Sequence, residues 1–337
     1  MLTGLSSARW LAAAHGAASQ SMPIVTAYDT LGEEAIKHSL LATEPKAIFF
    51  DPQLIGTLSN TLKDATSVTT VIYNDEHEMK EAYINELKEH HEKLRIFSIE
   101  EVRKLGEENM VDPVPPHSDD LCCIMYTSGS MAAPKGVMLK HKNIVAAGET
   151  IKCNSFKIRL TCDPVAGVDA VVGHVIGPSD AIIAYLPLAH IFEFAVENAS
   201  FLWGSVLGYG SAKTLSDGSM KNCKGDIREF RPTLMVGVPT VWEGIRKGII
   251  AKVEQQGWIA RTVFWGALAA KDWLLRNNLP GSSLCDKAVF GKVRDATGGR
   301  MRACANGAGP ISRDTQRFIS MVVAPMISGY GMTETSG

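Results

Sequence analysis

The sequence contains short apolar runs that alternate with helix-length segments, and this alternation limits the possible folds. Residues 23–28 (PIVTAY), 46–50 (KAIFF) and 68–73 (VTTVIY) are the kind of run found in strands buried on both faces. Residues 31–42 (LGEEAIKHSLLA) separate the first two runs and have the spacing of an amphipathic helix. Because a parallel connection has to cross back over its sheet, this order predicts an α/β fold with parallel-sheet subdomains and flanking helices. The first helix is expected within residues 1–22, with no strand before it.

A charge-rich segment follows the third apolar run. Residues 75–105 have few apolar side chains, and these recur at helical spacing, which predicts a surface helix packed by one edge. The apolar positions are Met79, Tyr83, Leu87 and Leu94. Residues 112–120 (DPVPPHSDD) are then expected to interrupt both helix and strand, because proline fits the interior of neither.

Composition excludes several classes of protein. The 337 residues are 45% hydrophobic and 21% charged with a formal net charge of −2, so no nucleic-acid partner is expected. No apolar run approaches the roughly 18 residues of a membrane span, so any membrane association is expected to be peripheral. The cysteines lack CxxC pairs and metal-ligand spacing, which favours reduced thiols in a cytosolic environment. They are Cys122, Cys123, Cys153, Cys162, Cys223, Cys285 and Cys304.

Residues 124–139 (IMYTSGSMAAPKGVML) predict two strands joined by an anion-binding loop. The small residues of the loop can turn backbone N–H groups and hydroxyls toward phosphate oxygens, and Lys135 adds a positive charge. These small residues are Thr127, Ser128, Gly129 and Ser130. A Walker-type loop is excluded, because Lys135 is followed by Gly136 and a strand-like run rather than by Ser or Thr and a helix. The alternative is a serine-rich hairpin that binds nothing.

The same stretch carries a resemblance to a known superfamily. YTSGSMAAPKG resembles YTSGSTGxPKG, the phosphate-loop signature of the adenylate-forming enzymes, which include acyl-CoA synthetases, luciferases and the adenylation domains of peptide synthetases. Two positions depart from the signature. Met131 replaces a threonine hydroxyl that could reach a phosphate, and Ala132 adds a Cβ where the pattern has glycine.

Residues 181–210 predict a buried strand ending at Pro187, a turn containing His190, and a helix that is apolar on most faces. The word LPLAHIFE (186–193) resembles the segment that walls the acyl pocket of long-chain acyl-CoA synthetases. That resemblance implies that His190 lies near the bound carboxylate. The alternative is a satisfied core histidine. Trp242, in the predicted helix after Pro239, is interpreted as a core residue in preference to a wall of the acyl channel.

The last third of the chain predicts two further strands that end in small, open turns, at residues 301–312 and 325–335. Such strand ends form a nucleotide-binding crevice at the carboxyl edge of a parallel sheet. In adenylate-forming enzymes GGSP-like and GYGxTE words occupy these places. The resemblance implies that the adenine is lined by Gly307, Ala308, Gly309 and Pro310. It also implies that Tyr330, beside Gly331, stacks on the adenine, that Thr333 touches the α-phosphate and that Glu334 holds Mg²⁺. The alternatives are a packed Tyr330 and a solvated Glu334.

Together the motifs resemble the fungal type of long-chain fatty acyl-CoA synthetase. The implied reaction is attack of a long-chain fatty acid carboxylate on the α-phosphate of ATP, which gives acyl-adenylate and pyrophosphate, followed by displacement of AMP by the thiol of coenzyme A. No general base is needed, because the carboxylate is already ionised. The implied catalytic residues are Lys135, His190, Thr333 and Glu334.

The resemblance identifies residues 1–337 as an AMP-binding domain, a part of the adenylate-forming amino-terminal domain that is incomplete at both ends, with an insertion at 152–167. In that family a ribose-binding aspartate, a hinge and a domain with a catalytic lysine follow the GYGxTE word. This chain alone is therefore expected not to complete acyl-CoA synthesis. The alternatives are an inactive nucleotide- or acyl-binding paralogue, a gene fragment, and another adenylate-forming ligase. The expected location is the cytoplasm, including the cytosolic face of endoplasmic reticulum, lipid droplet or peroxisome membranes.

The two departures in the phosphate loop give a testable prediction. Replacing Met131→Thr and Ala132→Gly together should raise nucleotide affinity or adenylation with little change in melting temperature, because both positions concern phosphate contact. Calorimetric titration with Mg-ATP and a thermal melt measure the two effects. If affinity and adenylation both stay the same, the departures are neutral.

Overall fold

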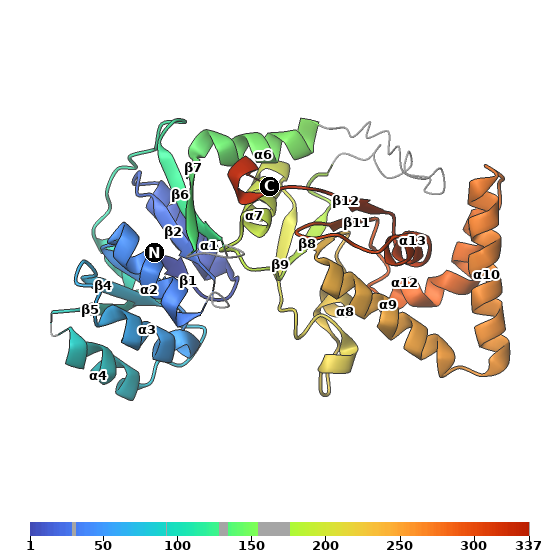
Figure 1. Ribbon diagram of the computed structural model, residues 1–337, viewed down its shortest axis with the longest axis horizontal. Coiled ribbons are helices and arrows are strands. Elements are labelled where there is room, and N and C mark those ends of the chain that lie inside the picture. The colour runs from blue at the N-terminus through green and yellow to red at the C-terminus, as the bar shows by residue number, and fades with distance from the viewer. Residues whose placement is uncertain (29–31, 92, 128–133, 154–175, 337) are drawn as a thin grey trace. The chain divides into compact units, whose positions relative to one another are not determined.

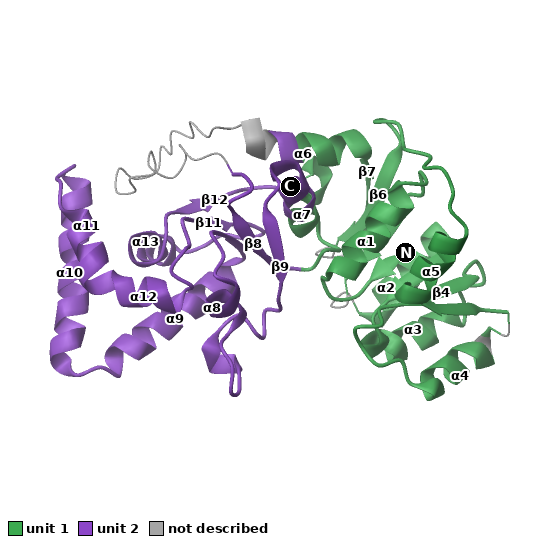
Figure 2. Cartoon of the chain, turned by 180° about the vertical axis from the view of Figure 1, so that it is seen from behind, with its two compact units in different colours: residues 1–147, 187–195, 332–337 green, residues 148–186, 196–331 purple. Residues whose placement is uncertain are grey.

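The computed structural model describes residues 1–336 except 29–31, 92, 128–133 and 154–175 (Figure 1). The chain forms two compact units, each with its own sheet (Figure 2). Unit 1 comprises residues 1–147, 187–195 and 332–337, and unit 2 comprises residues 148–186 and 196–331. Of the helices in the described ranges, none combines the length and the apolar character that a membrane crossing requires.

The sheet of unit 1 has seven strands in the order β5-β4-β3-β1-β2-β6-β7, and every neighbouring pair is parallel except β6 and β7. Its strands are β1 (Leu2–Thr3), β2 (Ile24–Ala27), β3 (Ala47–Phe50), β4 (Thr70–Tyr73), β5 (Arg95–Ser98), β6 (Leu121–Thr127) and β7 (Lys135–Lys140). The predicted α/β fold with a parallel sheet is confirmed. The prediction of no strand before the first helix is wrong: β1 lies between β2 and β3. A two-residue strand is too short to show a hydrophobic period.

The helices of unit 1 flank this sheet (Figure 1). They are α1 (Ala8–Ala18), α2 (Glu33–Thr43), α3 (Ile55–Leu62), α4 (Glu81–His90) and α5 (Ile99–Glu108), with α6 (His141–Cys153) beginning in this unit. The three apolar runs supply the core: Ala27, Phe50 and Val71, one from each run, are fully buried. Leu40 of α2 and Leu62 of α3 pack in the same cluster, so the helices cover the sheet with their apolar sides.

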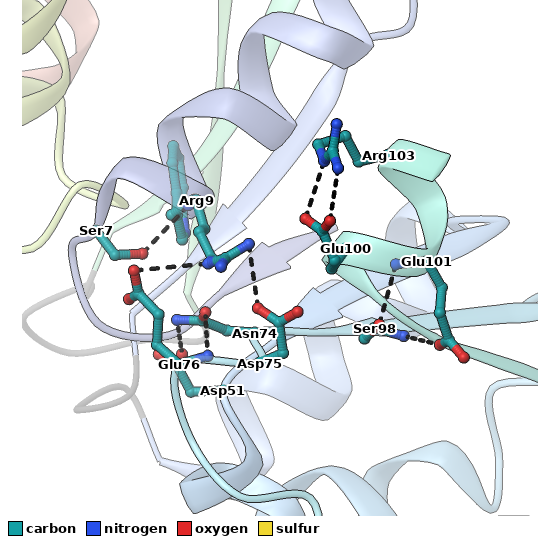
Figure 3. Close-up of polar contacts among 11 residues, drawn as sticks. Ser7, Arg9, Asp51, Asn74, Asp75, Glu76, Ser98, Glu100, Glu101 and Arg103 are labelled. Carbon is teal, nitrogen blue, oxygen red and sulfur yellow. Dashed lines mark hydrogen bonds and ion pairs between the residues drawn. The ribbon is translucent and has the colours of Figure 1, made fainter. Parts of the chain in front are cut away.

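The predicted single surface helix over residues 75–105 is wrong, because β5 separates α4 from α5. The apolar stripe is real, since Leu87 and Leu94 are buried in the unit 1 core. Ser98 accepts a hydrogen bond from the backbone of Glu101, whose carboxylate accepts one from the backbone of Ser98 (Figure 3). This capping box, Ser-x-x-Glu, was the sequence signal for a helix start at residue 98.

A buried carboxylate connects three strands of unit 1 at their carboxyl ends. Asp51, directly after β3, accepts a hydrogen bond from Nδ2 of Asn74 at 2.8 Å (Figure 3). It also accepts one from the backbone N–H of Leu5 at 2.5 Å. Leu5 follows β1 and Asn74 follows β4. Gly4 has φ +137°, and a Cβ there would lie 2.4 Å from Oδ2 of Asp51, so only glycine permits this approach.

The sheet of unit 2 is entirely parallel, in the order β12-β11-β10-β8-β9. Its strands are β8 (Ala181–Ala184), β9 (Val206–Tyr209), β10 (Leu234–Gly237), β11 (Ala303–Asn306) and β12 (Met326–Ser328). The helices are α7 (Ile191–Trp203, which begins in unit 1), α8 (Asp226–Phe230), α9 (Pro239–Glu254), α10 (Trp258–Arg276), α11 (Ser282–Cys285), α12 (Gly291–Ala296) and α13 (Arg313–Val322). The strand predicted to end at Pro187 ends earlier, at Ala184. Most of the segment predicted as an insertion, 152–167, lies outside the described residues.

Asp180 connects four strands of unit 2 at their amino ends. Its carboxylate accepts two hydrogen bonds from Arg302, at 2.8 and 2.7 Å, and one from the hydroxyl of Thr233 at 2.7 Å. Its carbonyl accepts the N–H of Val206. These residues precede or begin β8, β11, β10 and β9 respectively. Burial raises the pKa of Asp180, but the hydrogen bonds outweigh burial and lower that pKa to about 2.

Removing the arginine should leave a buried charge without its partner. We expect Arg302→Ala to lower the free energy of unfolding by about 3 kcal/mol at neutral pH. Because the pKa of Asp180 is depressed, its contribution is complete above about pH 4 and is lost as the pH falls toward 2, so the difference between variant and wild type should shrink there. Urea denaturation at several pH values measures it. Lys224→Ala, which breaks the exposed Lys224–Glu229 pair, is the control and should change little. Equal effects of the two variants would contradict this account.

Candidate nucleotide-binding site

The two predicted strands are present, as β6 (Leu121–Thr127) and β7 (Lys135–Lys140). Strands β6 and β7 form an antiparallel hairpin in which Thr127 lies opposite Lys135. Thr127 is half-buried and the side chain of Lys135 is exposed. The predicted site residues Ser128, Gly129 and Ser130 lie outside the described residues. The same holds for the two departures from the signature, Met131 and Ala132. The hairpin therefore positions both ends of the loop, and its lysine extends from the start of β7.

The glycine after Lys135 is required by packing across the hairpin. Gly136 lies directly opposite Tyr126, which is buried. A Cβ on Gly136 would lie 2.9 Å from Cγ2 of Ile124 and 3.2 Å from Cζ of Tyr126. The ring of Tyr126 also meets that of His38 edge-on at 6.0 Å between centroids. The tyrosine and the glycine of the phosphate-loop signature are thus explained by the fold, independently of any ligand.

His190 lies close to the carboxyl end of β2, the strand next to β6. Strands β2 and β6 are parallel neighbours, with Thr26 beside Met125, so they end at the same edge of the sheet. The hydroxyl of Thr26 donates to the carbonyl of Ala189 at 3.0 Å, and the ring centroid of His190 lies 6.2 Å from that of Tyr28, the residue after β2. His190 and Thr127 therefore share one sheet edge.

The local contacts of His190 define its chemistry. Burial lowers its pKa, which favours the neutral ring at pH 7. Its Nδ1 accepts a hydrogen bond from the backbone N–H of Phe192 at 3.2 Å, so the proton of the neutral ring is on Nε2. His190 can consequently donate one hydrogen bond to an oxygen atom of a ligand.

Thr333 and Glu334 lie in the same unit as the hairpin. They belong to the short 3₁₀ turn η6 (Thr333–Thr335), which packs against β7. Hydrogen bonds between Met332 and the hydroxyl of Thr335, at 3.2 and 3.0 Å, stabilise the turn. Thr333 is buried and Glu334 is exposed. The fold thus gathers Thr127, Lys135, His190 and this turn in one compact unit, although they are distant in sequence.

The donor set around Glu334 is compatible with a cation shared with a ligand. Across the described ranges, no cluster of three or more His, Cys, Asp or Glu residues is arranged to hold a metal ion. Mg²⁺ is usually held by one or two carboxylates together with substrate phosphates and water. The single exposed carboxylate of Glu334 fits that arrangement. It does not fit a site in which protein side chains alone hold the metal.

The predicted adenine-lining residues form a turn at the carboxyl edge of the unit 2 sheet. The N–H of Gly307 donates to the carbonyl of Gly237, at the end of β10, at 3.0 Å. Asn306 donates from Nδ2 to the carbonyl of Gly309 at 3.1 Å, and its own carbonyl accepts the N–H of Gly329 at 2.8 Å. The residues of the turn, Gly307, Ala308, Gly309 and Pro310, are thereby fixed beside the ends of β10 and β12. Tyr330 is 93% exposed and Gly331 is also exposed, so both are accessible within this unit.

Sequence reasoning missed two residues that support this turn. The Oδ1 atom of Asn306 is buried and has no hydrogen-bond partner among the described residues. A Cβ on Gly237 would lie 2.8 Å from both Trp242 and the hydroxyl of Tyr185. The interpretation of Trp242 as a core residue is confirmed, since its side chain is fully buried. The glycine that ends the apolar run LMVG was the available signal for close packing here.

Helix α7 does not simply bury its apolar side chains and expose its polar ones. Phe194 and Trp203 are buried, but Phe201 is 62% exposed. Glu197 is fully buried and accepts a hydrogen bond from the hydroxyl of Tyr209 at 2.7 Å. Burial raises the pKa of Glu197 to about 7, against the smaller effect of that hydrogen bond. The helix therefore carries a carboxyl group that is partly protonated at neutral pH.

Comparison with known proteins identifies the family. The model of the family described as AMP-binding enzyme matches residues 1–337, the whole chain. The chain belongs to the AMP-binding enzyme family. Family membership explains why the phosphate-loop motif, the turn at 307–310 and the GYGxTE motif occur in one chain in this order.

Similar proteins of this family include fungal ligases. Palmitoyl-CoA ligase FUM16 of Gibberella moniliformis is 42% identical over 335 residues, which are 99% of this chain and 47% of that protein. Long-chain-fatty-acid–CoA ligase 1 of Schizosaccharomyces pombe is 45% identical over 333 residues, 98% of this chain and 46% of that protein. The chain thus spans about half the length of the curated relatives it matches. The resemblance to fungal long-chain fatty acyl-CoA synthetases is confirmed.

A solved structure supports the fold. The adenylation domain of a carboxylic acid reductase from Segniliparus rugosus, in complex with AMP and a co-purified carboxylic acid, superposes with a TM-score of 0.71 at 19% identity. The match covers 98% of this chain and 48% of that one. The predicted adenylation-domain fold is therefore confirmed.

The turn at 307–310 contains a strained residue. Ala308 has φ +60°, a left-handed conformation that is unfavourable for a residue with a Cβ. We expect Ala308→Gly to raise the free energy of unfolding by about 1 kcal/mol, measured by urea denaturation, because glycine adopts this φ without strain. Ala305→Gly in strand β11 is the matched control and should lower it. A loss of stability in both variants would show that the left-handed conformation carries no cost here.

Proposed function

We propose that this protein activates long-chain fatty acids in an ATP-dependent reaction, forming acyl-adenylate and then acyl-CoA. The observation that carries the proposal is the gathering of the hairpin residues Thr127 and Lys135 with Thr333 and Glu334 in unit 1. Family membership and the names of the fungal relatives, palmitoyl-CoA ligase and long-chain-fatty-acid–CoA ligase, give the substrate class.

The residues of unit 1 have the chemistry needed to bind a triphosphate. The ammonium of Lys135 is exposed, so it is available to phosphate oxygens. Hydroxyl groups of Thr127 and Thr333 can donate to the same kind of oxygen. Because these donors are held by a hairpin and a turn, they need little reorganisation when negative charge builds on the α-phosphate. Mg²⁺, held by Glu334 and the phosphates, would neutralise part of that charge when bound.

His190 is proposed to orient the fatty acid carboxylate. Its Nε2–H can donate one hydrogen bond, and its neutral state at pH 7 follows from burial. A neutral donor positions a carboxylate without forming an ion pair that would reduce its nucleophilicity. The apolar side of α7 follows His190 directly in sequence and is proposed to contact the acyl chain.

In unit 2, the turn 307–310 is proposed to contact the adenine, with Tyr330 and Gly331. The exposed ring of Tyr330 offers a stacking surface. The buried Oδ1 of Asn306 lacks a hydrogen-bond partner within the described residues, so it can accept a bond from a donor that enters this turn. Adenine has an exocyclic amino group, which is such a donor.

Coenzyme A is proposed as the second substrate, since the relatives are named CoA ligases. A cytoplasmic location with peripheral attachment to a membrane is proposed as well, at the endoplasmic reticulum, lipid droplets or peroxisomes. Such attachment would give the enzyme access to substrates that partition into lipid.

The role of Lys135 is directly testable. A charge-assisted hydrogen bond contributes roughly 1.5 to 3 kcal/mol, so Lys135→Ala should weaken Mg-ATP binding by about one to two decades. Isothermal titration calorimetry measures the affinity. Lys140→Ala is the matched control: Lys140 lies at the other end of β7, is also exposed, and pairs with Asp119 at 2.9 Å. Its removal should leave ATP affinity unchanged.

The proposed reaction is tested by incubating the chain with ATP, Mg²⁺, a long-chain fatty acid and coenzyme A, and following pyrophosphate and acyl-CoA separately. Fatty-acid-dependent release of pyrophosphate supports adenylation, and acyl-CoA is measured separately because this chain alone is expected not to complete the second step. Nucleotide binding without any pyrophosphate release would instead favour an inactive nucleotide-binding paralogue. A folded sample that does not bind Mg-ATP rejects the proposal.

A further inference from the structure

The tryptophans of this chain divide into two groups. Trp10, Trp203 and Trp242 are buried, with at most 6% of their surface exposed. The other three of the six lie on one helix, α10, and face solvent: Trp258 is 72% exposed, Trp265 37% and Trp273 59%. Half of the indole side chains of the protein are therefore on the surface of one 19-residue helix. Indole rings have a large apolar area, so this placement calls for a partner surface.

Helix α10 buries only one side. Phe264 and Lys271 point into unit 2, where the Lys271 ammonium donates to Asp286 at 2.6 Å and to the carbonyl of Met321 at 2.5 Å. The residues on the opposite side recur every three to four positions and are exposed along the whole helix. We name this side the α10 face. It consists of Trp258, Ile259, Thr262, Val263, Gly266, Ala269, Ala270, Trp273 and Arg276.

The α10 face has one charged residue, Arg276 at its C-terminal end, which pairs with Asp272 at 3.0 Å; so few charges are unusual for the solvent side of a surface helix. Besides its two tryptophans, Ile259 is 61% exposed and Val263 51% exposed. Leu284 of the neighbouring helix α11 adds a further apolar side chain that is 69% exposed.

The surroundings of the α10 face are basic. Residues 258–294 contain six basic and two acidic residues, a formal charge of +4 in a chain whose net charge is −2. Both acidic residues are neutralised: Asp272 pairs with Arg276 at 3.0 Å and with Arg317, and Asp286 pairs with Arg294 at 2.9 Å in addition to Lys271. The exposed charged residues of this segment are all basic: Arg261, which pairs with Glu254 at 3.2 Å, Arg276, Lys287 and Lys292. Lys271 is buried on the opposite side of α10, where it and the half-buried Arg294 pair with Asp286.

We propose that the α10 face docks on an anionic lipid surface. An apolar helix face with tryptophans and basic neighbours is the composition of helices that lie in the plane of a membrane interface. Indole rings favour this interface because they combine an apolar body with one N–H donor. The positive charge of the segment complements the anionic headgroups.

This inference identifies the surface for the peripheral attachment proposed above. It rests on the proposed function only in that an enzyme acting on fatty acids would find its substrate in a membrane. The experiment contains no nucleotide and no fatty acid. Failure of membrane binding is therefore distinguishable from failure of ATP binding or adenylation.

The experiment is co-sedimentation of the 337-residue chain with phosphatidylcholine vesicles, with and without phosphatidylserine. We expect binding to vesicles with phosphatidylserine, and weaker binding at high salt or without the anionic lipid. Trp258→Ser with Trp273→Ser should weaken binding at least about tenfold, because two large apolar side chains no longer enter the interface.

A matched control and a spectroscopic readout make the test specific. Met110→Ser with Val111→Ser removes two apolar side chains that are 83% and 71% exposed in unit 1, and it should leave vesicle binding unchanged. Brominated lipids should quench tryptophan fluorescence on binding. Trp258→Phe with Trp273→Phe should retain much of the binding and lose most of this quenching, because the remaining exposed indole, Trp265, lies at the border of the face.

Several outcomes would overturn the proposal. One is a folded chain, verified by circular dichroism, that does not sediment with anionic vesicles. Another is equal binding by the Trp258/Trp273 serine variant and the Met110/Val111 control. Concentration-dependent self-association that the serine variant abolishes, measured by analytical ultracentrifugation without lipid, would assign the α10 face to a second copy of the chain instead.

Discussion

Parallel strand pairing is the constraint on which both sets of candidate residues depend. Parallel neighbours all end at the same sheet edge, so loops that are far apart in sequence meet there. In unit 1 this pairing puts the segment holding His190, beside the end of β2, and Thr127, at the end of β6, on one edge. In unit 2 it aligns the ends of β10, β11 and β12, which hold the turn 307–310. The antiparallel pair of β6 and β7 returns the chain so that Lys135 lies opposite Thr127.

In each unit a buried aspartate links the ends of several strands through hydrogen bonds. Asp180 in unit 2 and Asp51 in unit 1 have different kinds of hydrogen-bond donor. Asp180 receives a guanidinium, and its pKa falls despite burial. Asp51 receives only neutral donors, so burial dominates and its pKa is raised. Arg9 pairs nearby with Asp75 at 3.1 Å, not with Asp51 (Figure 3). Unit 2 thus depends on a charge pair, whereas unit 1 depends on close backbone approach at Gly4.

Much of the fold could be predicted because strands such as β2, β3 and β8 are buried on both faces and give continuous apolar runs. The runs ending near Ala27, Phe50 and Tyr73 are all strands. Strands β1 and β5 were missed, the first because two residues show no period and the second because charged neighbours hide a short edge strand. The hairpin and the turn at 307–310 were predicted from sequence motifs. Those motifs could not indicate that Asn306 and Gly237 support the turn. The bond from Gly307 to Gly237 spans 70 positions and the bond from Gly329 to Asn306 spans 23, whereas single-sequence patterns report only local spacing.

The sequence by itself determined the α/β class, the family words and the residue types able to bind phosphate, because these are properties of local spacing and side-chain chemistry. Only the tertiary structure decided that Gly136 is required by the ring of Tyr126, since that contact exists only across the hairpin. It also decided which apolar side chains are buried. Trp242 and Trp258 are the same type of residue, but Trp242 is fully buried and Trp258 is 72% exposed. Burial depends on which face of a helix meets the sheet or a neighbouring helix, and that is settled only when distant segments pack together.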